Sequence, residues 1–155
     1  MTIEDIYKNI PFTSYQNKAF ASIMYLGVMG ERYIETKLAE FNISTQQFRI
    51  LRLLRRTTDG MPIYTIAQYL PDRKSDISRL IERMHKSGLV SRKRDKKDKR
   101  VYNVLINQAG LNILAAIDSK EGDINFDIPD FNEEKAKILY EHLQVLVDAF
   151  YKALP

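Results

Sequence analysis

The sequence predicts a mainly α fold of the α+β class, in which one two-stranded β hairpin accompanies several helices. Three observations predict it. Apolar residues recur at three- and four-residue steps through most of the chain, strict alternation is confined to residues 89–106, and Gly and Pro separate these segments. At 155 residues and 45% hydrophobic content, the chain suits one domain whose core needs no disulfide.

The first helices follow from the apolar period. Residues 1–12 are expected to form a short helical turn that Pro11 stops. Ser14 can cap a helix that continues to residue 41 and ends at Asn42. One face of this helix is apolar and contains Tyr15, Ala19, Ile23, Leu26, Gly30, Tyr33, Ile34, Leu38 and Phe41. Because the helix is long, we expect this face to contact more than its own small domain.

The next helix begins with a cap at Ser44 or Thr45. Its inward side chains are Phe48, Leu51 and Leu54, and its outward ones are Arg49, Arg52, Arg55 and Arg56. A turn at residues 57–60 follows. Pro62 then suits the first turn of a third helix, whose apolar face contains Ile63, Ile66, Ala67 and Leu70.

Pro71 and Asp72 separate the third helix from a fourth, which ends with Lys86 and Gly88. Its inward residues are Ile77, Leu80, Ile81 and Met84. Residues 89–94 and 100–106 are then extended and flank a charged tip, so they predict a β hairpin. In its second strand, one face carries Tyr102, Val104 and Ile106.

Two more helices complete the chain. Asn107 can cap a helix that runs to about residue 119, and Gly122 and Pro129 interrupt the helical period over residues 121–131. The last helix starts near Asn132. We expect it to bury Ile138, Leu139, Leu143, Leu146, Val147 and Phe150.

Composition excludes several classes of site. The chain has no cysteine, which rules out disulfides, thiolate metal ligands and cysteine nucleophiles. His85 and His142 are too few for a metal cage and suit polar surface positions, so we expect no metal and no cofactor. The sequence lacks G-x-S-x-G, a glycine-rich phosphate loop and H-E-x-x-H, and it is not expected to be an enzyme.

We expect no membrane association. No run approaches the roughly 18 apolar residues that a spanning helix needs. The first residues, MTIEDIYKNIPF, lack the basic and apolar regions of a signal peptide. These features predict a cytoplasmic protein.

The positive charge is concentrated in one segment. The chain has a net charge of +4. Residues 73–100 contain twelve Lys and Arg against four Asp and Glu, a net charge of +8, and the rest of the chain carries −4. A basic element on an acidic body is typical of a nucleic-acid-binding surface, although a solvated charged surface is the simpler explanation when such a cluster is taken alone.

Two helices joined by a short turn and followed by a hairpin form a helix-turn-helix with a wing. The fourth helix is the recognition helix, because its N-terminal residues and outward side can reach base edges and phosphates. These residues are Arg73, Lys74, Ser75, Asp76, Ser78 and Arg79. The wing adds a projection that can follow the DNA backbone and insert an arginine into a minor groove.

Residues 47–110 resemble the multiple antibiotic resistance regulator (MarR) family of winged-helix transcription factors. The resemblance is carried by IAQYL at 66–70, by SRLIERMHKSGLVSRKRD at 78–95 and above all by the wing. Asp98-Lys99-Arg100, Val104, Ile106 and Gly110 fit the pattern Asp-x-Arg, three residues, Val-x-Leu-Thr-x-x-Gly. Asn107 replaces Thr and Ile106 replaces Leu, substitutions that preserve a helix cap and a strand.

The resemblance implies a role for each wing residue. Arg100 would reach the minor groove. Asp98 would hold the wing in shape by pairing with Arg79; the alternative is that Asp98 is an incidental charge at the tip of the wing. The DNA-binding residues of the wing would be Arg94, Lys96, Lys97, Asp98, Lys99 and Arg100. The family's small-molecule pocket would be lined by Tyr25, Met29, Tyr33, Phe48 and Leu51, although the aromatic ones also suit core or interface positions.

We therefore expect a single MarR-like domain over residues 1–155, with a winged helix-turn-helix lobe at 44–106 and a helical dimerisation region at 14–41 and 107–155. The expected function is a sequence-specific transcriptional regulator, a repressor, that binds double-stranded DNA as a homodimer. We also expect the operator to be pseudo-palindromic and the regulator to be released from it by a small aromatic or lipophilic effector. The alternative is a winged-helix protein-interaction module without sequence-specific DNA binding.

Overall fold

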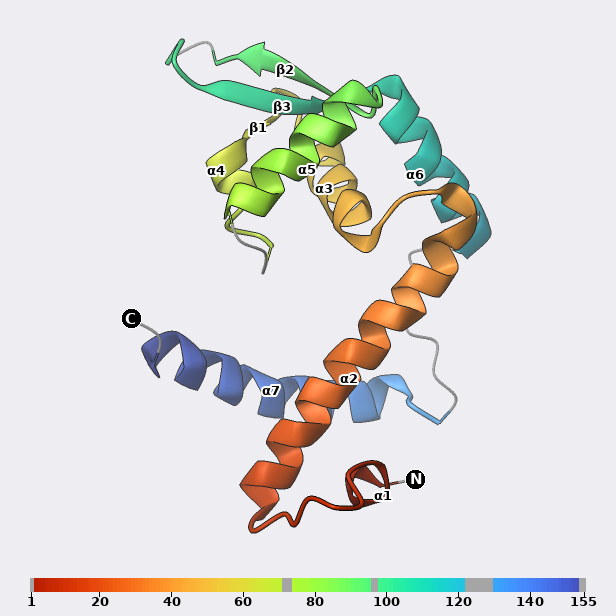
Figure 1. Ribbon diagram of the computed structural model, residues 1–155, viewed down its shortest axis with the longest axis vertical. Helices are drawn as coiled ribbons and strands as arrows, with labels where there is room; N and C mark the ends of the chain where they lie inside the picture. The colour runs from red at the N-terminus through yellow and green to blue at the C-terminus, as the bar shows by residue number, and fades with distance from the viewer. Residues whose placement is uncertain (1, 71–73, 96–97, 122–129, 154–155) are drawn as a thin grey trace. The chain divides into compact units, whose positions relative to one another are not determined.

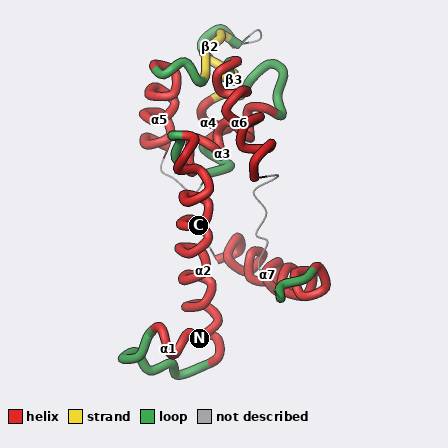
Figure 2. The backbone as a smooth tube through the Cα atoms, turned by 90° about the vertical axis from the view of Figure 1, so that its right-hand side faces the viewer, coloured by secondary structure: helices red, strands yellow, loops and turns green. Residues whose placement is uncertain are grey.

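A computed structural model describes residues 2–70, 74–95, 98–121 and 130–153 (Figure 1). The chain divides into two compact units, Met1–Ile124 and Asn125–Pro155. The first unit holds six α-helices and one sheet among its described residues, and the second holds one helix. Figure 2 shows that most of the described chain is helical and that the strands lie together in one place.

The N-terminal helices start where the sequence predicts. In α1 (Ile3–Ile6), Thr2 and Asp5 form a capping box. The predicted short turn is present, but it ends at Ile6 with Tyr7 as its C-cap, so the prediction that Pro11 stops it is wrong. In α2 (Tyr15–Leu38), the Ser14 hydroxyl accepts a hydrogen bond from the Asn17 N–H at 3.2 Å, so Ser14 is the predicted cap. The last turn tightens to a 3₁₀ helix at Ala39–Phe41, and Asn42 ends it with a left-handed φ of 53°.

Helix α3 (Thr45–Arg55) is capped by Ser44, which decides between the two predicted caps. The Ser44 hydroxyl accepts from the Gln47 N–H at 3.2 Å, and the Gln47 side chain accepts from the Ser44 N–H at 2.8 Å. The inward positions are correct, and the structure adds two buried residues, Thr45 and Ile50, to the predicted Phe48, Leu51 and Leu54.

The segment at 61–66 corrects the prediction for Pro62. Met61–Pro62 is a short strand, β1, and Pro62 is the cap residue before a one-turn helix, α4 (Ile63–Ile66), rather than part of its first turn. The reason is tertiary, because Met61 and Pro62 pair with Val104 and Asn103. A proline is tolerated here because β1 is an edge strand. It has a neighbouring strand on one side only, so it needs no N–H donors on the other side.

Helix α5 (Lys74–Lys86) buries the four residues that the sequence predicts. Ile77, Leu80, Ile81 and Met84 are all at most 9% exposed. The helix ends in a Schellman motif, in which the Gly88 N–H donates to the His85 carbonyl and the Leu89 N–H to the Met84 carbonyl. Gly88 has a φ of 76°, the left-handed conformation that glycine adopts without strain.

The sheet has three antiparallel strands in the order β1-β3-β2, not the two that the sequence predicts. The predicted hairpin is present: β2 (Val90–Arg94) pairs with β3 (Tyr102–Ile106), with Val90 opposite Ile106 and Arg94 opposite Tyr102. The second strand starts at Tyr102 rather than at residue 100. We call this hairpin, with its turn, the wing.

One core joins these elements. Side chains from α2, α3, α4, α5, both wing strands and α6 (Gln108–Glu121) form a single buried cluster. Gly110 lets α6 approach closely, since a Cβ there would lie 2.8 Å from the Leu89 carbonyl oxygen and 2.9 Å from Leu51 Cδ2. This core fixes α5 and the wing on one scaffold.

The second unit contains α7 (Glu133–Ala153), which Asn132 caps through the Lys135 N–H at 3.1 Å. The predicted burial of its apolar residues is wrong for the single chain, because no residue of α7 is buried. Ile138 is 53% exposed and Phe150 49%. The physical reason is that α7 is the one described helix of its unit, so its apolar stripe has no neighbour there. None of the helices described could cross a membrane.

Candidate nucleic-acid interface

The start of α5 presents an exposed polar face. Ser75, Asp76 and Arg79 are exposed and Ser78 is half-buried, while the opposite face lies in the core. These are predicted recognition residues, and the helix brings them onto one side. Arg73 and the side chain of Lys74, also predicted to contact DNA, lie outside the described residues.

A groove of about 770 Å³ separates this face of α5 from the wing. It is lined by Asp76, Ser78, Arg79, Glu82, Arg83 and Arg92. Across it, Arg92 of β2 forms an ion pair with Glu82 of α5, with 2.8 Å between Nη2 and Oε2. This pair joins β2 to α5, so the two elements with predicted DNA contacts are positioned together.

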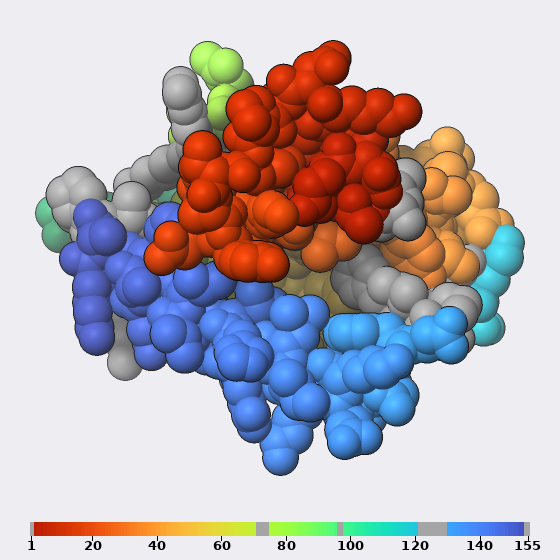
Figure 3. Space-filling view, turned by 90° about the horizontal axis from the view of Figure 1, so that it is seen from below, coloured from red at the N-terminus to blue at the C-terminus, as the bar shows by residue number. Residues whose placement is uncertain are grey.

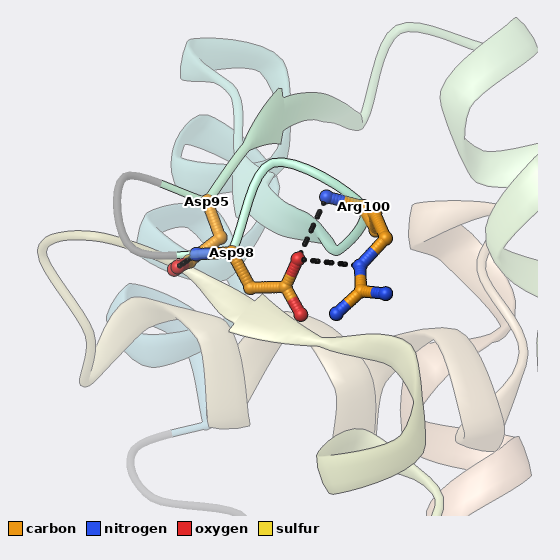
Figure 4. A network of polar contacts seen from close by, with 3 residues as sticks. All are labelled: Asp95, Asp98 and Arg100. Carbon is orange, nitrogen blue, oxygen red and sulfur yellow. Dashed lines mark hydrogen bonds and ion pairs between the residues drawn. The ribbon is translucent and has the colours of Figure 1, made fainter.

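Arg100 stands at the tip of the wing with a side chain that is 92% exposed. Asp98 orients it: one carboxylate oxygen, Oδ1, accepts from the Arg100 backbone N–H at 3.0 Å and from its Nε at 3.3 Å (Figure 4). Asp98 therefore holds the wing through Arg100, and the structure shows no Asp98–Arg79 pair between these two described residues. An oriented guanidinium that faces solvent is suited to a minor groove.

Asp95 is a second organising residue, and the sequence prediction did not assign it a role. Its Oδ1 accepts from the Asp98 N–H at 2.9 Å, and its Oδ2 accepts from Asn103 Nδ2 at 3.0 Å. Asn103 is only 9% exposed, and its amide also donates to the Asp59 carbonyl at 3.4 Å. The available signal was an Asp that ends a strand three residues before Asp98, a pattern typical of side-chain-closed turns.

The other predicted wing residues differ in their surroundings. Arg94 donates through Nε to the Tyr102 hydroxyl at 3.0 Å, and its guanidinium lies 5.7 Å from the centre of the Tyr102 ring. This contact stiffens the hairpin and restrains the arginine. Lys99 is exposed at the tip. Lys96 and Lys97 lie outside the described residues.

The five residues predicted for an effector pocket are in different surroundings. Phe48 and Leu51 belong to the core, at 5% and 0% exposure. Met29 is 42% exposed on α2, where Tyr25 and Tyr33 are half-buried. The structure therefore accounts for Phe48 and Leu51 by packing, and the pocket stays a prediction. Across the described ranges, no group of three His, Asp or Glu side chains could hold a metal ion.

A helix-turn-helix on a common core with a basic hairpin beside its second helix defines a winged helix-turn-helix fold. The sequence model described as MarR family matches residues 43–102, the segment from α3 to the first residue of β3. Residues 43–102 are thus similar to the MarR family, and the solved structures that resemble the chain include a MarR transcriptional regulator.

Solved structures have a similar fold. A MarR transcriptional regulator from Methanosarcina mazei Go1 is 29% identical, with a TM-score of 0.64 over 86% of this chain and 96% of that one. S. aureus MepR in a DNA complex has a TM-score of 0.76 at 19% identity, over 88% and 99%. CouR from Rhodococcus jostii RHA1, bound to p-coumaroyl-CoA, has a TM-score of 0.67 at 19% identity, over 87% and 95%. No curated protein sequence matches the chain significantly.

Proposed function

We propose that this protein is a sequence-specific, DNA-binding transcriptional regulator that represses its target genes as a homodimer. The observation that carries the proposal is the pairing of an exposed polar face on α5 with an oriented, 92% exposed Arg100 on the adjoining wing. The similarity of the fold to MepR in its DNA complex supports the same reading.

The two elements would contact DNA differently. The first turns of α5 would enter the major groove, where Arg79 can pair with guanine and Asp76 can accept from cytosine. Arg100 would enter the adjacent minor groove, and the lysines of the wing would contact phosphates. The Arg92–Glu82 ion pair keeps the helix and the wing in register for both contacts.

Exposed apolar side chains on α2 and α7 support the homodimer. Helix α2 exposes Phe20, Met24 and Leu26, and α7 exposes Ile138, Val145 and Phe150, all by 49% or more. Both helices lie at the surface, α7 in blue and the N-terminal segment in red, in Figure 3. Such stripes are covered in oligomers, and a two-fold dimer would place two recognition helices on half-sites about one DNA turn apart.

Release by a small effector is the regulatory part of the proposal. CouR is bound to p-coumaroyl-CoA, which supports ligand control in a protein of this fold. A ligand that binds better to a dimer whose lobes are wrongly spaced for DNA would lower operator occupancy by population shift.

A competition gel shift tests the proposal. The purified protein is titrated against the duplex upstream of its own gene, with random duplex of equal length as competitor. We expect tighter binding to one upstream segment, with protection of two half-sites. Equal affinity for both duplexes would overturn the regulator proposal and favour a winged-helix module that binds an acidic protein.

A further inference from the structure

A second hollow lies on the outer side of the domain, between α3 and the segment that follows α4. Its volume is about 250 Å³, and it is lined by Arg49, Arg52, Leu53, Arg56, Tyr69 and Leu70. None of these residues belongs to the face of α5 or to the wing. We propose that this hollow binds a small organic anion, whose carboxylate or phosphate contacts the arginines and whose apolar part contacts Leu53, Leu70 and Tyr69.

The positive charge of the hollow comes from one helix face. Arg49 and Arg52 on α3 and Arg56 at its C-cap are spaced three and four residues apart, so their side chains lie in a row. Arg49 forms an ion pair with Glu31 of α2, and the Arg52 guanidinium lies 5.4 Å from the centre of the Phe48 ring. Both arginines are therefore held in place by neighbours rather than extended freely into solvent.

Arg56 supplies the uncompensated charge. Within the described residues, no hydrogen bond or ion pair joins its guanidinium to another side chain, and no carboxylate lines the hollow. On the same helix, by contrast, Arg55 forms an ion pair with Asp118 of α6. A guanidinium fork is suited to carboxylates and phosphates because it can donate two parallel hydrogen bonds.

The remaining lining residues set the kind of anion. Leu70 is 8% exposed and Leu53 is half-buried, whereas Tyr69 is 65% exposed and forms one side of the hollow. The volume lies just below the roughly 300–1,000 Å³ of typical ligand pockets, so the occupant is small. Arginines beside a tyrosine and leucines favour an anion that carries a planar apolar group over inorganic phosphate alone.

The position of the hollow gives it a route to DNA binding. Leu70 directly precedes the segment that leads into α5. A ligand that contacts Leu70 and Tyr69 therefore acts on the entry to the recognition helix, and its binding should be coupled to DNA affinity. This coupling rests on the proposed function, whereas the anion site itself does not.

Binding is measured first without DNA. The full chain is titrated with phenyl phosphate, with inorganic phosphate and with phenol, by calorimetry and by amide chemical shifts. We expect saturable binding of phenyl phosphate at least about tenfold tighter than of either part, with shifts at α3 and residues 69–70. Arg56→Gln should weaken it at least about tenfold, and Tyr69→Ala should remove the preference over inorganic phosphate.

Arg55→Gln is the matched control, since it removes one guanidinium from the same helix outside the hollow. Unfolding curves show that each variant is folded. An equal loss in Arg55→Gln and Arg56→Gln, or no saturable binding, would overturn the site. A third outcome would also overturn the anion site: phenyl phosphate does not bind, and Arg56→Gln lowers the affinity for every duplex. Arg56 would then be a contact to the DNA backbone.

The coupling is tested with the operator segment found by the gel shift. Saturating phenyl phosphate should change the operator affinity of the wild type at least about fivefold and leave that of Arg56→Gln unchanged. If phenyl phosphate binds but operator affinity does not change, the effector role is overturned and the site stands. If no operator exists, the proposed function fails independently of the anion titration.

Discussion

Substitution of Asp95 tests how the wing is held together without removing any of the side chains that we propose to contact DNA. Asp95 is the acceptor for two hydrogen bonds inside the wing, from the Asp98 N–H at 2.9 Å and from Asn103 Nδ2 at 3.0 Å. Asp95→Ala removes both. It leaves the amide of buried Asn103, whose Oδ1 already has no hydrogen-bond partner, with a 3.4 Å contact to the Asp59 carbonyl.

The expected loss of stability follows from these two hydrogen bonds. Each contributes about 1 kcal/mol when a half-buried carboxylate is the acceptor, so Asp95→Ala should lower the free energy of unfolding by about 2 kcal/mol. With a urea m-value of about 2 kcal/mol per molar, the midpoint falls by about 1 M. The wing turn that orients Arg100 would then be ordered only on binding, and operator affinity should fall roughly tenfold.

Asp95→Asn is the matched control because it removes the same charge but keeps an oxygen that can accept from the Asp98 N–H. It should lose about half as much stability, measured by urea unfolding, and less operator affinity, measured by fluorescence anisotropy. Because both variants lack the negative charge of Asp95, the difference between their operator affinities does not include the general effect of that charge on DNA binding. If both unfold at the wild-type midpoint, the assignment of Asp95 as an organiser of the wing is refuted.

Three further predictions test other parts of the structure. Arg100→Ala should leave the unfolding midpoint unchanged, because its side chain is 92% exposed, and should weaken operator binding by about tenfold to a hundredfold in anisotropy titrations; unchanged affinity would exclude its minor-groove role. Gly60→Ala should destabilise the fold by about 2 kcal/mol or more in urea, because φ is +74° and a Cβ would lie 2.4 Å from the Val104 carbonyl oxygen; wild-type stability would contradict this geometry. The hydrogen bond from Lys18 lowers the pKa of the Glu4 carboxyl from its ordinary value of 4.5. This contact therefore stabilises α1 at pH values above 4.5, and the stabilisation is lost as the pH falls through the lowered pKa. An NMR titration should show this shift in the wild type, and Lys18→Ala should raise the pKa of Glu4 towards its ordinary value.

Local patterns were sufficient for most helix starts. Ser14 and Ser44 lie at predicted cap positions, and Asn132 lies at the predicted start of the last helix. Each accepts a hydrogen bond from the backbone N–H three residues later, an interaction set by neighbours in sequence. The end of α5 at Gly88 is local for the same reason. The inward residues of α3 and α5 followed from the apolar period, because a helix has one buried face.

Long-range contacts were not predictable in this way. Strand β1 has two residues, too few for a period, and exists because Met61 and Pro62 pair with residues more than forty positions later. Asp98 was expected to bind Arg79 but binds Arg100, two residues away, and Asp95 reaches Asn103 across the hairpin. Nothing in the spacing of charges alone distinguishes these partners.

Local sequence patterns are enough to predict the winged helix-turn-helix class, the helix proposed to contact bases and the basic wing, because apolar period, caps and the Asp98–Gly110 pattern are properties of neighbouring residues. The tertiary structure decided which wing residues are held and which are presented. Arg92 and Arg94 are engaged by Glu82 and Tyr102, whereas Arg100 is oriented towards solvent. It also decided that α7 exposes the apolar stripe that its sequence would place in a core. Burial depends on which elements surround a side chain, and one helix does not contain that information.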